Sequence, residues 1–345
     1  MTVPNNERGS NQRLPVVLLG DGERLRAVVA AAAASGLIEI VAQSGMPQAA
    51  ALPNIPWQND PRVLLADVDA AAVVLAGSTR ADLAAADLVI ERGMHVWRLP
   101  PLARSFSESC EALRRAARPG LVYRVASWWE HVVDHAWGEI AWPEGFRPLL
   151  SELRLAQPAP AETSWRVSIS ESGGGALAGE AYGLCEVLVA TRNLPERVFA
   201  ATRVFRRATP AGTREAEDSA TALLEYVDGG LAALTAAWGV PPTQTQLLHH
   251  GASASAQLTG DSLSLLDSAG TVLDHRPLPT DWLAADIQRF VALVRGSAAD
   301  RAAVTLERHL AVSALLEAIY LSSQTHHPEA PLKFYEVQGR SAPRA

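Results

Sequence analysis

The sequence predicts an α/β protein, in which an N-terminal Rossmann-type, doubly wound parallel sheet is followed by an α+β domain with a largely antiparallel, open sheet. Three observations predict this fold. Up to about residue 120, short apolar runs alternate with helical stretches of about 10–15 residues. The run Ala71–Ala76 is apolar throughout, which suits a parallel strand buried on both faces. Beyond Leu121, strand-like segments follow one another, and Asp228-Gly229-Gly230 between two of them is typical of a hairpin.

The elements of the first domain follow in order. Gly36 is the expected C-cap of the first helix, because glycine adopts the left-handed conformation that ends many helices. Strands are expected over 15–19, 38–42, 71–76, 94–97 and 122–127, and helices over 23–35, 80–92 and 107–118. Strands joined by helices in this way form right-handed βαβ units.

The second domain is predicted to be mainly antiparallel. Strands are expected over 151–155, 164–169, 197–204, 221–227, 231–237, 254–258, 262–266, 271–273 and 331–335, with helices over 282–295 and 306–324. The domain boundaries follow from this change of pattern. We expect a disordered tail over 1–13, the Rossmann-type domain over 14–121 and the α+β domain over 122–345.

Composition excludes several classes of protein. The formal net charge of −7 argues against binding to nucleic acid or to an anionic membrane surface. Residues 1–13 are polar and lack the apolar region of a signal peptide, and no run long enough to span a membrane occurs elsewhere. With only Cys110 and Cys185, a disulfide framework is excluded, so we expect a cytoplasmic protein.

The first strand–helix turn has the context of a dinucleotide-binding fingerprint. Gly20 permits a tight turn, and Gly22 lets the backbone approach a pyrophosphate at the start of the helix, beside Glu23. The third glycine of such a motif is replaced by Leu25, and Gln43-Ser44-Gly45 after the second strand lacks the acid that binds ribose hydroxyls. The sequence therefore predicts NAD or NADP as a cofactor, with binding that is weak or lost.

Several motifs occur in the order and spacing of one known enzyme family. They are Val68–Ala76, Gly93-Met94-His95-Val96-Trp97, Pro100-Pro101-Leu102-Ala103, Ser172-Gly173-Gly174-Gly175-Ala176-Leu177, Glu215-Ala216-Glu217-Asp218 and Asp228-Gly229-Gly230. With these motifs the chain resembles the Gfo/Idh/MocA family, whose members include glucose–fructose oxidoreductase and inositol dehydrogenase. The resemblance implies an NAD(P)-dependent oxidoreductase acting on a sugar or a cyclitol, with Ala76 and Pro100 beside the cofactor.

The same resemblance implies that the usual catalytic groups are replaced. The family's catalytic lysine falls on Leu99, its aspartate on Gly179 and its histidine on Gly183, while a further acid falls on Glu186. Lys333 is the only lysine in the chain, and arginine cannot act as an acid or base in its stead. Tyr182, Glu186, His131 and His135 are then the candidate acid–base groups.

His131 and His135 lie four residues apart, so a helix would place them on one face. Together with Asp134 they could seed a metal site, but no further ligands are evident, and we predict no metal. Contacts with a sugar-type ligand, or plain packing of the neighbouring tryptophans, remain as alternatives. Glu186 could equally be a salt-bridged helix acid, and Tyr182 an aromatic side chain that lines a pocket.

Two functions remain open, beside a third in which the same pocket serves a lyase or an epimerase. The chain is either an oxidoreductase with replacement acid–base groups, or a pseudoenzyme that serves as a ligand-binding or partner subunit. In both cases the partners are a small, carbohydrate-like molecule and a second chain, either a copy of this one or an active relative. The open sheet of the second domain is the expected surface of association, since its exposed face needs a cover.

Overall fold

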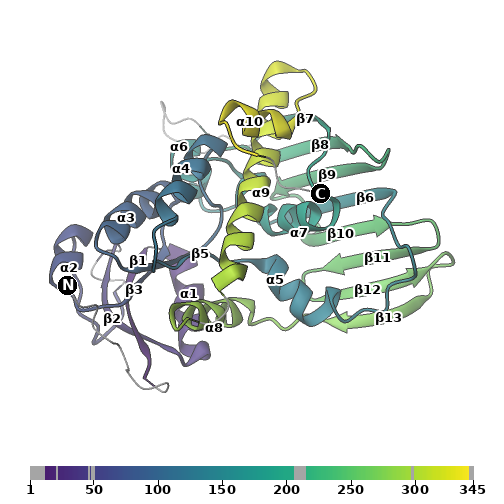
Figure 1. Ribbon diagram of the computed structural model, residues 1–345. Helices are drawn as coiled ribbons and strands as arrows, with labels where there is room; N and C mark the ends of the chain where they lie inside the picture. Colours follow the sequence, from purple (N-terminus) through teal and green to yellow (C-terminus); the bar gives the residue numbers. More distant parts are fainter. Residues whose placement is uncertain are drawn as a thin grey trace.

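The computed structural model describes residues 12–20, 22–45, 47, 51–205, 215–296 and 299–341. In this part of the chain two sheets lie side by side, and the long helix α9 (Ala299–Thr325) runs between them (Figure 1). The predicted fold class is confirmed, because one sheet is parallel with helices on its faces and the other is largely antiparallel.

The first sheet has five parallel strands in the order β2-β1-β3-β4-β5. Its strands are β1 (Leu14–Gly20), β2 (Ile38–Ser44), β3 (Ala72–Ala76), β4 (His95–Arg98) and β5 (Tyr123–Val125). Its helices are α1 (Gly22–Ser35), α2 (Pro61–Asp67), α3 (Thr79–Glu91) and α4 (Phe106–Ala116). Every residue of β3 is buried, as its apolar run predicts for a central strand covered on both faces.

The first domain recruits elements from the far end of the chain. Helix α8 (Trp282–Val294) packs against α1, and its Ile287 and Phe290 share a core with Val16 and Leu18 of β1. Strand β5 also lies beyond the predicted boundary at residue 121. The first domain therefore comprises a continuous N-terminal segment and a helix contributed from the C-terminal part of the chain.

The second sheet has eight strands in the order β13-β12-β11-β10-β6-β9-β8-β7, antiparallel except for the parallel pair β6 and β9. The strands are β6 (Leu150–Gln157), β7 (Arg197–Arg203), β8 (Ser219–Glu225), β9 (Leu231–Trp238), β10 (Gln244–His250), β11 (Ala254–Thr259), β12 (Ser262–Asp267) and β13 (Val272–Pro277). Buried and exposed residues alternate along β7, β8 and β9. Helices α7 (Tyr182–Arg192) and α9 cover the buried face.

Short helical turns connect the two sheets near the interface. They are α5 (Trp128–Val132), η2 (Val133–Trp137), η3 (Trp165–Val167), α6 (Ile169–Ser172) and η4 (Ala176–Glu180). The strand predicted over 164–169 is wrong, because Ser164 caps a helical turn: its hydroxyl oxygen accepts a hydrogen bond from the Arg166 amide.

The predicted C-terminal strand over 331–335 is also wrong. This segment forms helix α10 (Pro331–Val337). Pro331 lies in the first turn, where a backbone N–H group would have no partner within the helix, so proline is tolerated there. The apolar residues of this segment serve to bury one face of the helix: Tyr335 packs edge-on against Phe106, with ring centres 4.9 Å apart. Lys333 lies on the exposed side of this helix.

Candidate functional site

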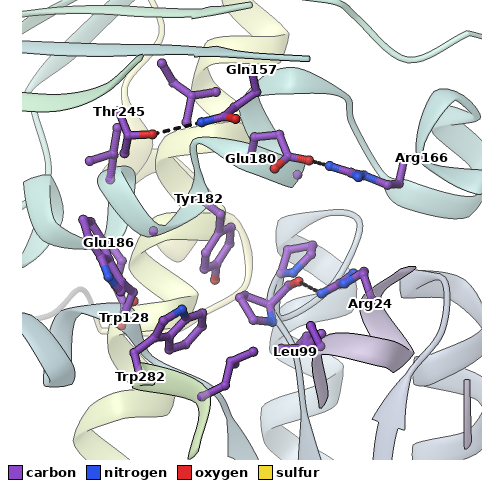
Figure 2. Close-up of a pocket in the computed structure, with 18 of the residues that line it drawn as sticks. Arg24, Leu99, Trp128, Gln157, Arg166, Glu180, Tyr182, Glu186, Thr245 and Trp282 are labelled. Carbon is purple, nitrogen blue, oxygen red and sulfur yellow. Dashed lines mark hydrogen bonds and ion pairs between the residues drawn. The ribbon is translucent and has the colours of Figure 1, made fainter. Parts of the chain in front are cut away.

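A cavity of about 600 Å³ lies where the carboxyl ends of the parallel strands face the second domain. Its walls come from α1, the start of α3, the loop after β4, the segment from η3 to α7, and the start of α8. Figure 2 shows Tyr182 near the centre of this cavity, with Trp128 and Trp282 on one side and Arg24 and Leu99 on the other. In open parallel sheets, this edge is where ligands usually bind.

The turn between β1 and α1 is built around Gly20. A Cβ atom at this position would lie 2.6 Å from the carbonyl carbon of Ala76, its partner in the parallel register. The glycine and the small residue opposite it thus bring β1 and β3 close together and leave the edge of the sheet open. Helix α1 begins at Gly22, while the side chain of Glu23 is outside the described residues.

Two polar features at this edge fit a dinucleotide. The start of α1 offers backbone N–H groups and the positive end of a helix dipole, the usual setting for a pyrophosphate. Thr79, at the start of α3, lines the cavity, and its buried Oγ1 has no hydrogen-bond partner among the described residues. A buried hydroxyl without a partner is costly, so a ligand atom there would stabilise it.

Arg24 adds a cation to the same place. Its Nη2 donates a hydrogen bond of 2.5 Å to the carbonyl oxygen of Pro100, and its guanidinium carbon lies 5.4 Å from the centre of the Trp165 ring. The side chain therefore connects the first helix to the loop after β4 and to the second domain.

The end of β2 offers no free side chain for a ribose. Gln43 is fully buried, and its amide group is used by the loop beyond the strand: Nε2 donates to the carbonyls of Leu52 and Ile55 at 2.8 and 3.0 Å, and Oε1 accepts from the Leu52 amide at 2.8 Å. The side-chain amide of Gln43, near the end of β2, is thus structural.

The loop after β4 presents an alkyl side chain where the resemblance expects lysine. Buried Arg98 holds this loop by donating to the carbonyls of Pro101 and Leu102 at 3.1 and 3.0 Å. Leu99 follows it and lines the cavity. Pro100 also lines the cavity, with its carbonyl group bound by Arg24.

The three glycines before α7 are required by close packing. A side chain at Gly174 would overlap the Tyr320 hydroxyl, and one at Gly175 would overlap the carbonyl oxygen of Glu217. The Glu217 carboxylate accepts hydrogen bonds from the amides of Gly175 and Leu177 at 2.7 and 3.0 Å, and burial raises its pKa. The turn is therefore fixed, and it sets the direction of the segment that carries Tyr182.

Gly179 and Gly183 both line the cavity, but they differ in the space around them. A Cβ atom at Gly179 would meet nothing within 4 Å, whereas one at Gly183 would lie 3.3 Å from Cε3 of Trp128. The Trp128 indole thus takes up space that a larger residue at position 183 would need.

Tyr182 lines the cavity and is otherwise buried. Its hydroxyl lies 3.0 Å from Nδ1 of His309 in α9, and the other ring nitrogen of His309 lies 3.3 Å from the carbonyl oxygen of Val125. Burial raises the pKa of Tyr182 well above its usual value and lowers that of His309 to about 3. His309 is therefore neutral at physiological pH.

Glu186, one turn further along α7, lines the same cavity and is 1% exposed. Its carboxylate accepts a hydrogen bond of 2.6 Å from the Ser127 hydroxyl and one of 3.3 Å from the Trp129 amide, at the start of α5. Burial is the largest influence on this group and raises its pKa to about 7. Of the four predicted acid–base groups, the structure thus places Tyr182 and Glu186 on the cavity wall.

His131 and His135 are not among the residues that line the cavity. Their rings pack together with centres 4.6 Å apart; His131 is buried with Nε2 2.8 Å from the carbonyl oxygen of Pro279, and His135 is exposed. In the described part of the chain, no cluster of three or more His, Cys, Asp or Glu side chains has the geometry to hold a metal.

Several lining residues carried no recognisable signal in the sequence. Trp165 and Trp282 add aromatic surface, Arg166 forms an ion pair with Glu180, and Gln157 donates to the Thr245 hydroxyl at 3.0 Å (Figure 2). Aromatic faces combined with a few hydrogen-bonding groups suit a small polyhydroxylated ring.

Comparisons with known proteins agree with this architecture. Residues 147–260 match the family model of the GFO/IDH/MocA C-terminal domain, which confirms the predicted resemblance. A search of curated proteins finds no significant match in sequence. Among the described residues, no helix is long and apolar enough to cross a membrane.

Three solved structures with similar folds contain NAD or NADH. Levoglucosan dehydrogenase, in complex with NADH, superposes with a TM-score of 0.77 at 18% identity, covering 92% of this chain and 99% of its own. GenD2 from gentamicin A biosynthesis, in complex with NAD, gives 0.76 at 19% identity, covering 96% and 99%. The WlbA dehydrogenase from Bordetella pertussis, in complex with NADH and UDP-GlcNAcA, gives 0.73 at 20% identity, covering 92% and 99%.

Proposed function

We propose that this chain, whose second domain matches the GFO/IDH/MocA family, is an NAD(P)-dependent oxidoreductase of a small carbohydrate-like molecule, with Tyr182 and Glu186 as its acid–base groups. One observation carries the proposal. The cavity at the carboxyl edge of the parallel sheet brings together a dinucleotide-type helix start and two titratable side chains, in spite of the loss of the lysine.

The cofactor supplies hydride chemistry when it is bound. The start of α1 and Arg24 would hold its pyrophosphate, and Thr79 would bind it through the buried hydroxyl. The contribution of the protein is then to bind the substrate and take up its hydroxyl proton. Glu186 suits the second task, because an acid–base group works best when its pKa lies close to the working pH.

The substrate would stack on the indole faces of Trp128, Trp165 and Trp282. Gln157 and Thr245 would bind its hydroxyl groups at the end of the cavity formed by β6 and β10. The relatives support this class of ligand, since levoglucosan dehydrogenase has been solved with NADH and levoglucosan, and also with L-sorbose. We further propose self-association through the outer face of the second sheet and a cytoplasmic location, which suits the two buried, unpaired cysteines.

The alternative function is a pseudo-oxidoreductase that binds a ligand or pairs with an active relative. A specific observation favours it: Leu99, Gly179 and Gly183 place no titratable group at the three positions where the resemblance expects catalysis. Under this alternative, Tyr182 and Glu186 are structural, as their hydrogen bonds to His309 and Ser127 allow.

A single set of measurements separates the two functions. NADH and NADPH are titrated by fluorescence, and NAD⁺ and NADP⁺ reduction is followed with a panel of sugars, anhydrosugars and cyclitols. The oxidoreductase requires turnover that falls in Tyr182→Phe or Glu186→Gln and persists in Glu180→Gln, a cavity acid paired with Arg166. Binding of a dinucleotide or of a sugar without any turnover would favour the pseudo-oxidoreductase. Turnover that neither substitution lowers would show that Tyr182 and Glu186 are not the acid–base groups.

A further inference from the structure

A line of buried polar groups on α7 and α9 runs beside the cavity. Tyr182 and Glu186 are four residues apart on α7, and the His309 side chain lies beside both. Its Nδ1 is 3.0 Å from the Tyr182 hydroxyl, and its Nε2 is 4.0 Å from Oε1 of Glu186. All three side chains are at most 1% exposed, so no bulk water competes for these contacts.

The hydrogen-bond partners assign the protons. A carbonyl oxygen can only accept, so the Nε2 atom of His309, 3.3 Å from the Val125 carbonyl, carries the hydrogen of the neutral ring. Nδ1 is then the acceptor, and the Tyr182 hydroxyl donates to it; the backbone carbonyl of His309 lies farther from this hydroxyl, at 3.4 Å. With its hydrogen directed toward His309, the Tyr182 oxygen accepts a hydrogen bond from the backbone of Leu102 and presents its remaining lone pair to a further donor.

We propose that His309 is a positioning residue that links Tyr182 to Glu186, so that a proton taken from a substrate hydroxyl at Tyr182 is passed through the imidazole to the Glu186 carboxylate. The proposal rests on the proposed oxidoreductase function. It assigns a role to a residue of the last long helix that no sequence motif indicated.

The proton transfers balance. The substrate O–H bond breaks and its proton bonds to Tyr182 Oη; the original Tyr182 proton moves to His309 Nδ1; and the Nε2 proton of His309 moves to Oε1 of Glu186. The two electrons of the substrate C–H bond leave with the hydride, for which an oxidised nicotinamide is the acceptor. Tyrosine and histidine end neutral, and only the carboxylate changes charge.

This order of transfers avoids an unfavourable intermediate. A protonated His309 would be a buried cation beside Arg308 and Arg124, which is why its pKa is low. Passing the Nε2 proton on to Glu186 keeps the ring neutral. The Nε2–Oε1 distance is longer than a hydrogen bond, and catalytic contacts of this kind commonly shorten when ligand is bound.

The first test uses the full-length protein and a substrate found by the screen above. His309→Gln keeps a side chain that can bond to Tyr182 but cannot accept a proton at one atom and release one at another. We expect kcat to fall by about 100-fold or more with little change in KM. His249→Gln is the matched control, because His249 is also buried and bonded to two hydroxyl groups but lies outside the cavity lining. Wild-type kcat in His309→Gln would overturn the proposal.

The second test needs no turnover and so separates failure of the relay from failure of the proposed function. The Glu186 carboxyl is followed by NMR in protein labelled at the glutamate carboxyl carbon, with Glu186→Gln to assign the signal. The groups that face it are Arg308 and His309 from α9, Glu130 from α5 and Tyr182 from its own helix.

We expect His309→Phe to raise the titration midpoint of Glu186, because the carboxylate loses its N–H neighbour. His309→Asn, which is smaller and polar, serves in the same way if the phenylalanine variant does not fold. A midpoint unchanged in a folded His309 variant would show that imidazole and carboxylate are not coupled, and the proposal would fail even if the protein oxidises sugars.

Discussion

Replacing Glu186 by glutamine should make the protein more stable at neutral and alkaline pH, and the gain should depend on pH. The carboxyl is 1% exposed, and burial raises its pKa from the ordinary 4.5 to about 7. The folded state therefore binds this proton more tightly than the unfolded state does. The stabilisation is fully present below about pH 4.5 and is lost as the pH rises through about 7.

The size of the effect follows from the same two values. A difference of this size, at about 1.4 kcal/mol for each pH unit, corresponds to about 3 kcal/mol across the interval. Glutamine has nearly the shape of the protonated acid. Its carbonyl oxygen can accept from the Trp129 amide in place of Oε2, and its NH2 group can donate to the Ser127 hydroxyl oxygen in place of Oε1. Glutamine avoids the cost of the buried charge, so the free energy of unfolding of the Glu186→Gln variant should lack this pH dependence.

The assay is urea unfolding of both proteins between about pH 5 and about pH 8, followed by tryptophan fluorescence. The free energy of unfolding of Glu186→Gln, relative to the wild type, should rise by about 3 kcal/mol over this range. Glu196→Gln is the control, since Glu196 is exposed just beyond α7. A difference between Glu186→Gln and the wild type that stays constant with pH would refute the reasoning from burial.

Three further predictions concern the turn, the cofactor and the second sheet. Gly175→Ala should destabilise the protein by about 3 kcal/mol, because its methyl group would overlap the Glu217 backbone, while Gly179→Ala, with open space around it, should change the melting temperature little; equal melting temperatures would contradict the packing argument. NADH should bind weakly, and Arg24→Ala should weaken NADH binding further by about tenfold, since a charge-assisted hydrogen bond is lost. Arg80→Ala, the control, should leave the affinity for NADH unchanged. A fluorescence titration that gives tighter binding in Arg24→Ala would exclude a pyrophosphate contact. The paired Phe199 and Leu223, 52% and 45% exposed on the outer face of the sheet, should lie in a contact between copies, so that Phe199→Glu converts a dimer to a monomer in sedimentation; a wild-type monomer at high concentration would rule this out.

The fold could be predicted because its signals are local. The continuous apolar run of β3 is the direct result of burial on both faces, and the Asp228-Gly229-Gly230 hairpin depends on a glycine with φ of +81° at its centre. The segment over 331–335 lacked such a signal, because a short apolar pattern fits a strand or one face of a helix equally well. Packing of this segment on α4 favours the helix over the strand, and that contact joins residues far apart in the sequence.

The site could be predicted only where a motif marks it. Tyr182 and Glu186 stood out because they follow the triple-glycine turn, and both line the cavity. His309 lies in an alanine- and leucine-rich helix, where a histidine is indistinguishable from an ordinary core residue until the fold brings it to Tyr182. Arg24 was visible only as a helix residue, because its contacts with Pro100 and Trp165 come from two other segments.

The leucine at position 99 and the raised pKa of Glu186 are physically connected. An ammonium group at position 99 would place a cation in the cavity that Glu186 also lines, and a nearby cation favours the charged form of an acid and lowers its pKa. Leu99 supplies no such charge, so burial dominates and the pKa rises to about 7. With leucine at position 99, the cavity therefore contains a carboxylate that can take up a proton near neutral pH. An active enzyme with this cavity would therefore transfer the proton through Glu186, because burial without a cation at position 99 brings the pKa of this carboxyl close to neutral pH.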